Sequence, residues 1–111
     1  MATKIGTTRE VYNDTPAISL WNDAIVLGAA SAESYTIPAG ISWVILSPTA
    51  AIWVDPAATA VVPAADIVDG TAPFRVGADV AYHVKVAPGQ VLSLIRESGA
   101  ATVSIQCWDK P

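Results

Sequence analysis

The side chains of this sequence that could do chemistry are few, and the densest group is a set of aspartates at Asp66, Asp69 and Asp79. Carboxylate oxygens are preferred ligands of Ca²⁺, and a pair of carboxylates across a cleft can hydrolyse a glycoside. The spacing of these three matches no calcium-binding loop, and nothing around them indicates a walled cleft. We therefore interpret them as solvated turn residues and predict no metal site.

One histidine, His83, and one cysteine, Cys107, complete the set of possible catalytic groups. A zinc site needs several His or Cys ligands, and the G-x-S-x-G turn of serine hydrolases is absent, as is a glycine-rich phosphate loop. Cys107 alternates with Val103 and Ile105, which predicts a buried position. We expect His83 to be exposed or at an interface. The sequence thus predicts no catalytic residues, no cofactor and no enzymatic activity.

Four tryptophans allow two interpretations. Trp43 and Trp53 lie in runs of Val and Ile, which favours packing in the core or at a sheet interface. Trp21 and Trp108 end strand-like runs, where burial against a partner is plausible because tryptophan buries much area and keeps one donor. The alternative is a platform of exposed rings that stacks on sugars.

The composition favours a protein surface that is partly covered by other protein. Hydrophobic residues make up 52% of the 111 residues and charged residues only 14%, against about 25% charged in a typical soluble domain. The net charge is −4, and residues 10–74 hold seven carboxylates and no Lys or Arg. Nucleic-acid binding is disfavoured because this charge repels phosphates. The apolar runs are short and broken by Pro and Gly, so no membrane span is expected.

Short strand-like runs separated by turn residues predict an all-β fold with no long helix. The expected strands are Ala17–Trp21, Ala24–Leu27, Ser34–Ile37, Ile41–Leu46, Ala50–Val54, Val80–Val86, Val91–Ile95 and Ala101–Trp108. Asn22-Asp23, Ser47-Pro48-Thr49 and the Pro/Gly groups near Gly40 and Gly89 are expected turns. We predict a single-domain β-sandwich or jelly-roll-like barrel of about eight short antiparallel strands.

Two segments fall outside this pattern. Residues 1–16 have little periodic hydrophobicity and are expected to form an extended N-terminal arm ahead of the sandwich domain at 17–111. Residues 56–79 form a long loop rich in Ala, Pro and Asp, within which Ala57–Ala65 is the best candidate for a short helix. Long loops in compact domains are usually functional or ordered by partners.

The chain also carries a weak internal repeat. The stretch from Tyr35 through Pro38-Ala39-Gly40 to Val54 is similar to the stretch from Val84 through Pro88-Gly89 to Ile105, at an offset of 49 residues between Gly40 and Gly89. Each half reads as strand, Pro/Gly turn, strand, turn, strand. Two related halves are typical of a sandwich built from two Greek keys, and chance similarity between hairpins is the alternative.

The pattern from Tyr35-Thr-Ile-Pro-Ala-Gly40 through Trp43-Val-Ile-Leu46 and Ile52-Trp-Val54, with the Val61–Thr71 loop and the hairpin from Val91 to Trp108, resembles small virion proteins of phages and prophages. The similarity covers about residues 33–108. The proteins that the chain resembles are small β-sandwiches encoded among head and tail genes, and capsid decoration or cement proteins are among them. The resemblance lies in the general pattern of strands and turns and includes no diagnostic catalytic motif. It therefore assigns a role to no individual residue.

The resemblance implies a non-enzymatic virion structural protein that stabilises the capsid through multivalent contacts and assembles in the cytoplasm of a bacterial host. The expected partners are the major capsid protein or other virion proteins, and copies of the chain itself, with a trimer suggested by the decoration analogy. The interface candidates are Trp21, Trp108, Arg9, Phe74 and Arg75. The alternatives are a carbohydrate-binding or host-attachment module and a tail or connector component.

Overall fold

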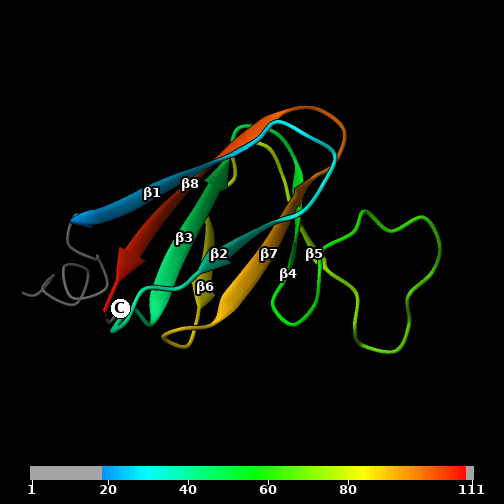
Figure 1. The fold of residues 1–111 in the computed structure, drawn as a ribbon. Helices are drawn as coiled ribbons and strands as arrows, with labels where there is room; N and C mark the ends of the chain where they lie inside the picture. The colour runs from blue at the N-terminus through cyan, green and yellow to red at the C-terminus, as the bar shows by residue number, and fades with distance from the viewer. Residues whose placement is uncertain (1–18, 110–111) are drawn as a thin grey trace, which may run out of the picture.

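The computed structural model describes residues 19–109 and confirms the predicted all-β sandwich. Its eight strands form two antiparallel sheets of four (Figure 1). They are β1 (Trp21–Leu27), β2 (Glu33–Thr36), β3 (Trp43–Pro48), β4 (Ile52–Asp55), β5 (Phe74–Val76), β6 (Tyr82–Lys85), β7 (Val91–Arg96) and β8 (Ala101–Trp108). No helix occurs among residues 19–109, so none there crosses a membrane.

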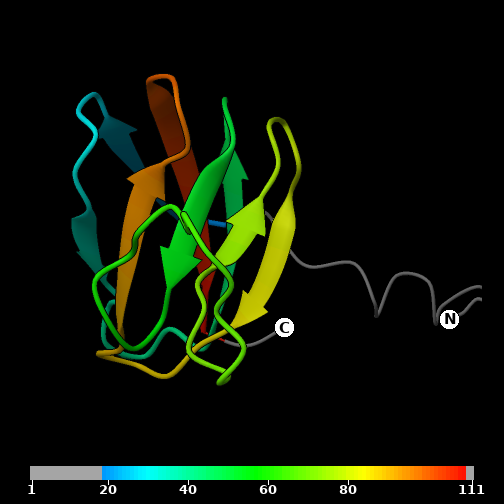
Figure 2. The same cartoon turned by 90° about the vertical axis from the view of Figure 1, so that its right-hand side faces the viewer.

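The strand order is that of a jelly roll. One sheet runs β1-β8-β3-β6 and the other β2-β7-β4-β5. The first strand pairs with the eighth, the second with the seventh, the third with the sixth and the fourth with the fifth. The chain therefore behaves as one long hairpin rolled over itself, which is how two Greek keys build a double-sheet jelly roll. Figure 2 shows the edge of this roll where β5 and β6 lie side by side.

The core lies between the sheets and is filled by alternate side chains of each strand. In β8 the buried positions are Ala101, Val103, Ile105 and Cys107, and the residues between them face outward. Large and fully buried side chains come from both sheets, among them Leu27, Leu46, Ile52, Val54, Leu92, Leu94 and Ile105. Period-two burial of Val, Ile and Leu thus supplies the hydrophobic free energy that holds the sheets together.

The two Pro/Gly turns of the internal repeat meet at one end of the sandwich. Gly40 and Gly89 both have φ of +81°, a left-handed conformation that glycine adopts without steric cost. The Ile37 N–H donates to the Gln90 carbonyl at 2.8 Å, and the Gly89 N–H donates to the Ile37 carbonyl at 3.0 Å. The turns therefore satisfy one another's backbone groups as well as reversing the chain.

Four local predictions were wrong. Ser47 and Pro48 do not form a turn, because they end β3 and pair with Ser104 and Val103 of β8. Asn22 and Asp23 form no turn, because β1 runs unbroken through them and pairs with β8 from Trp21 to Leu27. Ala57–Ala65 is not helical, and the loop over residues 56–79 is interrupted by β5, which pairs with β4. In each case long-range strand pairing or anchoring overrides a local preference. The predicted arm at 1–16 lies outside the described residues.

Candidate interaction surfaces

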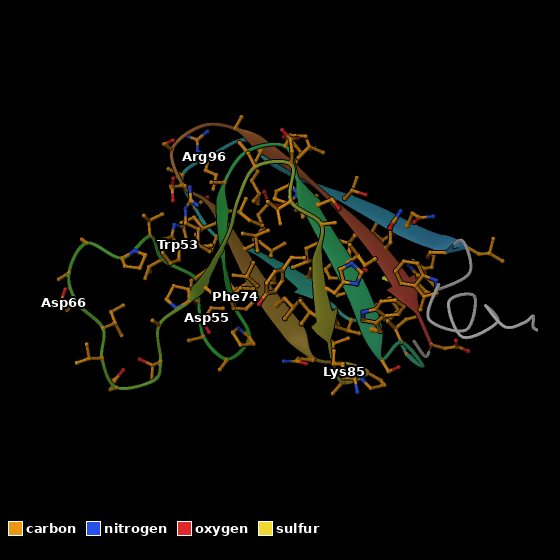
Figure 3. All side chains as sticks on the ribbon, turned by 180° about the vertical axis from the view of Figure 1, so that it is seen from behind. Trp53, Asp55, Asp66, Phe74, Lys85 and Arg96 are labelled. Atoms are coloured by element: carbon orange, nitrogen blue, oxygen red, sulfur yellow. The ribbon has the colours of Figure 1, made fainter. Side chains whose placement is uncertain are left out.

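The most prominent surface feature is the loop of residues 56–73, called here the projecting loop. It leaves the end of β4, stands out from the sandwich and returns to β5 (Figure 1). Figure 3 shows Asp66 on the outer turn of this loop and Asp55 where the loop meets the sheet. The loop lies on the opposite side of the molecule from β1 in both views.

The base of the projecting loop is fixed by two buried polar side chains. The Asp55 Oδ1 accepts hydrogen bonds from the Ala57 and Ala58 N–H groups at 2.9 and 2.8 Å. The Ser93 Oγ, on the neighbouring strand, accepts from the Ala60 N–H at 2.9 Å. Asp55 and Ser93 are opposite each other in the β4–β7 register. The loop thus leaves the sheet in a defined direction, because its first N–H groups are satisfied by the sheet itself.

The outer part of the loop combines apolar and acidic side chains. Its exposed apolar residues are Val61, Val62, Ile67 and Val68, and Val68 is 91% exposed. Asp69 accepts from the Thr71 hydroxyl at 2.6 Å and from its N–H at 3.1 Å, and these bonds lower the pKa of the Asp69 carboxyl. Residues 56–73 contain no Lys or Arg. The projecting loop is therefore an apolar, negatively charged protrusion with a fixed base.

A second candidate surface is the outward face of the β1-β8-β3-β6 sheet. Strand register puts a set of neutral side chains on this face: Asn22, Ala24, Val26, Thr102, Ser104, Gln106, Trp108, Trp43, Ile45 and Ser47. His83 and Lys85 of β6 lie opposite Ile45 and Trp43 on the same face. No outward position in these four described strands holds a carboxylate. The face can therefore be covered by protein without removing a charged acid from water.

One end of this face holds an aromatic cluster. The rings of Trp43 and Trp108 lie 4.7 Å apart at 31°, and those of Trp43 and His83 lie 5.6 Å apart at 39°. Trp43 and Trp108 are half-buried and His83 is exposed. Tilted rings at these distances attract each other beyond simple area burial. The cluster therefore stabilises the β3–β8 pairing and also offers an aromatic surface to a ligand.

Polar and aromatic side-chain contacts also lie on β4 and β5 of the other sheet. Glu97 accepts from Arg75 Nε at 2.7 Å and from Trp53 Nε1 at 3.1 Å, and the first of these bonds is the main reason that the pKa of Glu97 is lowered. The rings of Phe74 and Tyr82 lie 5.2 Å apart and bridge β5 of one sheet to β6 of the other. These side chains therefore have partners within the chain.

The predicted interface residues do not form one patch. Trp21 and Trp108 lie at the same end of the β1–β8 pair, but Trp21 is opposite the inward-facing Cys107, whereas Trp108 faces outward. Trp21 is 48% exposed. Phe74 and Arg75 lie on β5 in the contacts just described, and Arg9 lies outside the described residues.

Sequence reasoning missed most of the residues that make the two surfaces, and of its interface candidates only Trp108 lies on one of them. The only sequence feature that could have identified the four apolar residues of the projecting loop is their apolar character in a segment where no strand was expected. The alternation of buried and exposed residues in β8 identifies its small neutral residues as outward-facing. Which residues of β1 and β3 lie beside them is decided by the strand register, which the sequence does not show.

The residues that the sequence singles out for possible chemistry are spread over the described part of the chain. Residues 19–109 contain no group of three or more His, Cys, Asp and Glu side chains that could hold a metal ion. Cys107 faces the core and His83 faces outward, so the two belong to opposite faces of one sheet. Two shallow hollows of about 250 and 220 Å³ border the loop base, and Asp55 is the one titratable residue among those that line them. Its carboxylate already binds the loop backbone.

Comparison of the chain with known protein-family models, with curated proteins and with solved structures finds no match in any of the three. The assignment of a function therefore rests on the fold and the surfaces themselves.

Proposed function

We propose that this chain is a non-enzymatic structural protein of a phage virion, which decorates and stabilises the capsid through many protein–protein contacts. The observation that carries the proposal is the projecting loop. A protrusion with a fixed base and exposed Val61, Val62, Ile67 and Val68 gains free energy when these side chains are buried, and its anchored base reduces the entropy lost on binding.

The fold and the charge distribution support the same proposal. A double-sheet jelly roll is a common architecture of capsid domains, although the fold alone does not determine function. The outward face of the β1-β8-β3-β6 sheet is neutral along most of its length. On a shell that carries many copies, weak contacts of each copy add up, so no single interface needs to be tight.

The proposed partners are the major capsid protein or another virion protein, reached through the loop, and further copies of the chain. The acidic loop favours a partner groove that is apolar and flanked by Lys or Arg, because opposite charges guide association. Assembly would occur in the host cytoplasm, and the resemblance suggests a trimer. Position on the head or on the tail is decided by imaging the chain on particles.

The proposal is tested by co-sedimentation of purified chain with particles that lack it. We expect wild-type chain to pellet in saturable, stoichiometric amounts, and a variant with Val61, Val62, Ile67 and Val68 changed to Ser to stay in the supernatant. A matched control changes Val80 and Val91, which are each 47% exposed and lie outside the loop, to Ser. Loss of binding in the control but not in the loop variant would contradict the role of the loop.

The aromatic cluster favours one second candidate, a carbohydrate-binding or host-attachment module. Trp43, His83 and Trp108 together present rings on an outward sheet face, and such rings can stack on sugars. This function predicts quenching of tryptophan fluorescence by host-surface oligosaccharides, which is lost in Trp108→Ala. The structural function predicts no response to the same sugars.

A further inference from the structure

We infer that the chain self-associates through edge strand β1, which pairs antiparallel with β1 of a second copy across a two-fold axis. This inference goes beyond the proposed function, since it concerns a contact between copies and holds in or out of a particle. It also differs from the trimer that the resemblance suggests.

The first argument is that β1 is the least protected sheet edge in the described chain. An edge strand exposes unpaired N–H and C=O groups, and proteins blunt such edges with short length, charged side chains or proline. β2, β5 and β6 have four, three and four residues, and they carry Glu33, Arg75 and Lys85 respectively. β1 has seven residues and contains no Pro, Gly, Lys or Arg. The chain just before β1 is also held against β8, since the Ser19 Oγ donates to the Cys107 carbonyl at 2.7 Å.

The second argument concerns the one charge in β1, that of Asp23. Its Oδ2 accepts from Tyr35 Oη at 2.5 Å and from Trp21 Nε1 at 3.0 Å. Tyr35 belongs to β2 of the other sheet, so the carboxylate is directed across the sandwich and not along the open edge. The charge that could have protected this edge is therefore engaged inside the chain.

The third argument is that β1 is complementary to itself. Alternate residues face opposite sides of a sheet, so pairing must join residues of the same parity. Full-length antiparallel pairing of two seven-residue strands places Ala24 opposite Ala24 of the second copy and Asn22 opposite Val26. Asp23 then lies opposite Ile25, so the two carboxylates are never directly opposed. Small side chains meet at the axis, and every pairing is repeated by symmetry, as an isologous contact requires.

The fourth argument is what the contact covers. Val26 is 64% exposed on the outward face, and Trp21 is 48% exposed at the start of the strand. Pairing through β1 joins two neutral outward faces into one sheet, in the order β6-β3-β8-β1 followed by β1-β8-β3-β6 of the second copy. The projecting loops lie on the far side of each copy (Figure 1), so the same dimer leaves both loops free.

The test introduces charges of either sign at Ala24, the residue on the proposed axis. Sedimentation equilibrium then measures the molar mass of the full-length chain. Wild-type chain is expected to approach twice its mass of 11.5 kDa as its concentration rises. Ala24→Lys and Ala24→Asp each place like charges opposite one another and are expected to remain at the mass of a single chain. An equimolar mixture of the two variants is expected to recover the doubled mass, which misfolded variants could not do.

Crosslinking reports the same contact at one residue. Opposed residues of an antiparallel pair have Cα atoms about 4.5–5.5 Å apart, within disulfide range. Ala24→Cys is therefore expected to form a covalent dimer on mild oxidation, whereas Thr36→Cys, exposed on edge strand β2, is not; native Cys107 is buried in both. A wild-type chain that stays monomeric, a trimer, a mixture that does not recover the doubled mass, or equal crosslinking of both cysteine variants would overturn the inference.

Discussion

Tyr35 Oη donates a 2.5 Å hydrogen bond to the Asp23 carboxylate, and this bond joins β2 of one sheet to β1 of the other. The same phenol lies 3.5 Å from the Cys107 sulfur on β8. Three strands from both sheets therefore meet at one polar contact along the edge of the sandwich where β1 and β2 lie. The contact fixes the path of β1 before the chain crosses to β2.

Tyr35→Phe is expected to lower the free energy of unfolding by about 2 kcal/mol, because a hydrogen bond to a charged group is lost while the ring stays buried. Urea unfolding, followed by tryptophan fluorescence, measures the change. Tyr82→Phe is the matched control, because no hydrogen bond to the Tyr82 hydroxyl is recorded among the described residues and its ring contact with Phe74 is retained. Equal stability of Tyr35→Phe and wild type would contradict the role given to this bond.

The same contact predicts a loss of stability in alkali. Burial, together with the bond to Asp23, raises the pKa of Tyr35 above its ordinary 10.0, and burial raises the pKa of Cys107 above 9.0. The unfolded chain releases these protons first, so the stabilisation is fully present below pH 9.0 and falls as the pH rises through 9.0 and 10.0. Unfolding midpoints across this range check the slope. Tyr35→Phe should flatten its upper part, and an unchanged slope in that variant would refute the assignment.

The two turns that meet at the end of the sandwich predict a conformational cost for side chains. Gly40→Ala and Gly89→Ala should each destabilise the fold by about 1 kcal/mol, since both positions have φ of +81°. An added Cβ would meet nothing within 4 Å at either position, so a steric clash does not contribute to this cost. Gly99→Ala is the matched control, with equally open space and no positive φ. Thermal unfolding separates them, and equal effects at all three sites would show that backbone conformation is not the cause.

The loop base gives a prediction that separates anchoring from overall stability. Asp55→Ala removes the charged acceptor of two partly buried hydrogen bonds and should cost about 1–3 kcal/mol. It should also speed proteolytic cleavage within residues 56–73, as detected by mass spectrometry of the fragments. Asp66→Ala, on the exposed outer turn, should change neither. Cleavage at the wild-type rate in Asp55→Ala would mean that the loop is held by other contacts.

The sequence predicts the fold well where burial alternates along one strand. Ala101–Trp108 was predicted with its observed bounds, because Val103, Ile105 and Cys107 alternate with polar residues over the whole strand. The turn predicted at Asn22 and Asp23 was wrong because the pairing of β1 with β8 joins residues about 80 positions apart. The Asp23 carboxylate is bound by Tyr35 of the other sheet, which no local pattern shows. β5 was missed because Phe74–Val76 is too short to show a period.

The candidate surfaces were less predictable than the fold. The contact of Trp43 with Trp108 depends on the β3–β8 register, which no local pattern contains. The direction of the projecting loop depends on Ser93, which comes from a strand 33 residues beyond the loop residue that it binds. Side-chain types along the chain therefore indicate what a surface contains, while long-range hydrogen bonds decide where that surface lies.

The central claim, that the chain acts by association through its projecting loop, is tested most directly by an electron cryo-microscopy reconstruction of particles from cells that carry the gene. The account predicts a jelly-roll density at regular positions on the particle, with the loop of residues 56–73 directed into a neighbouring protein and Val68 buried there. A particle without this density, or a bound chain whose loop points into solvent, would contradict it.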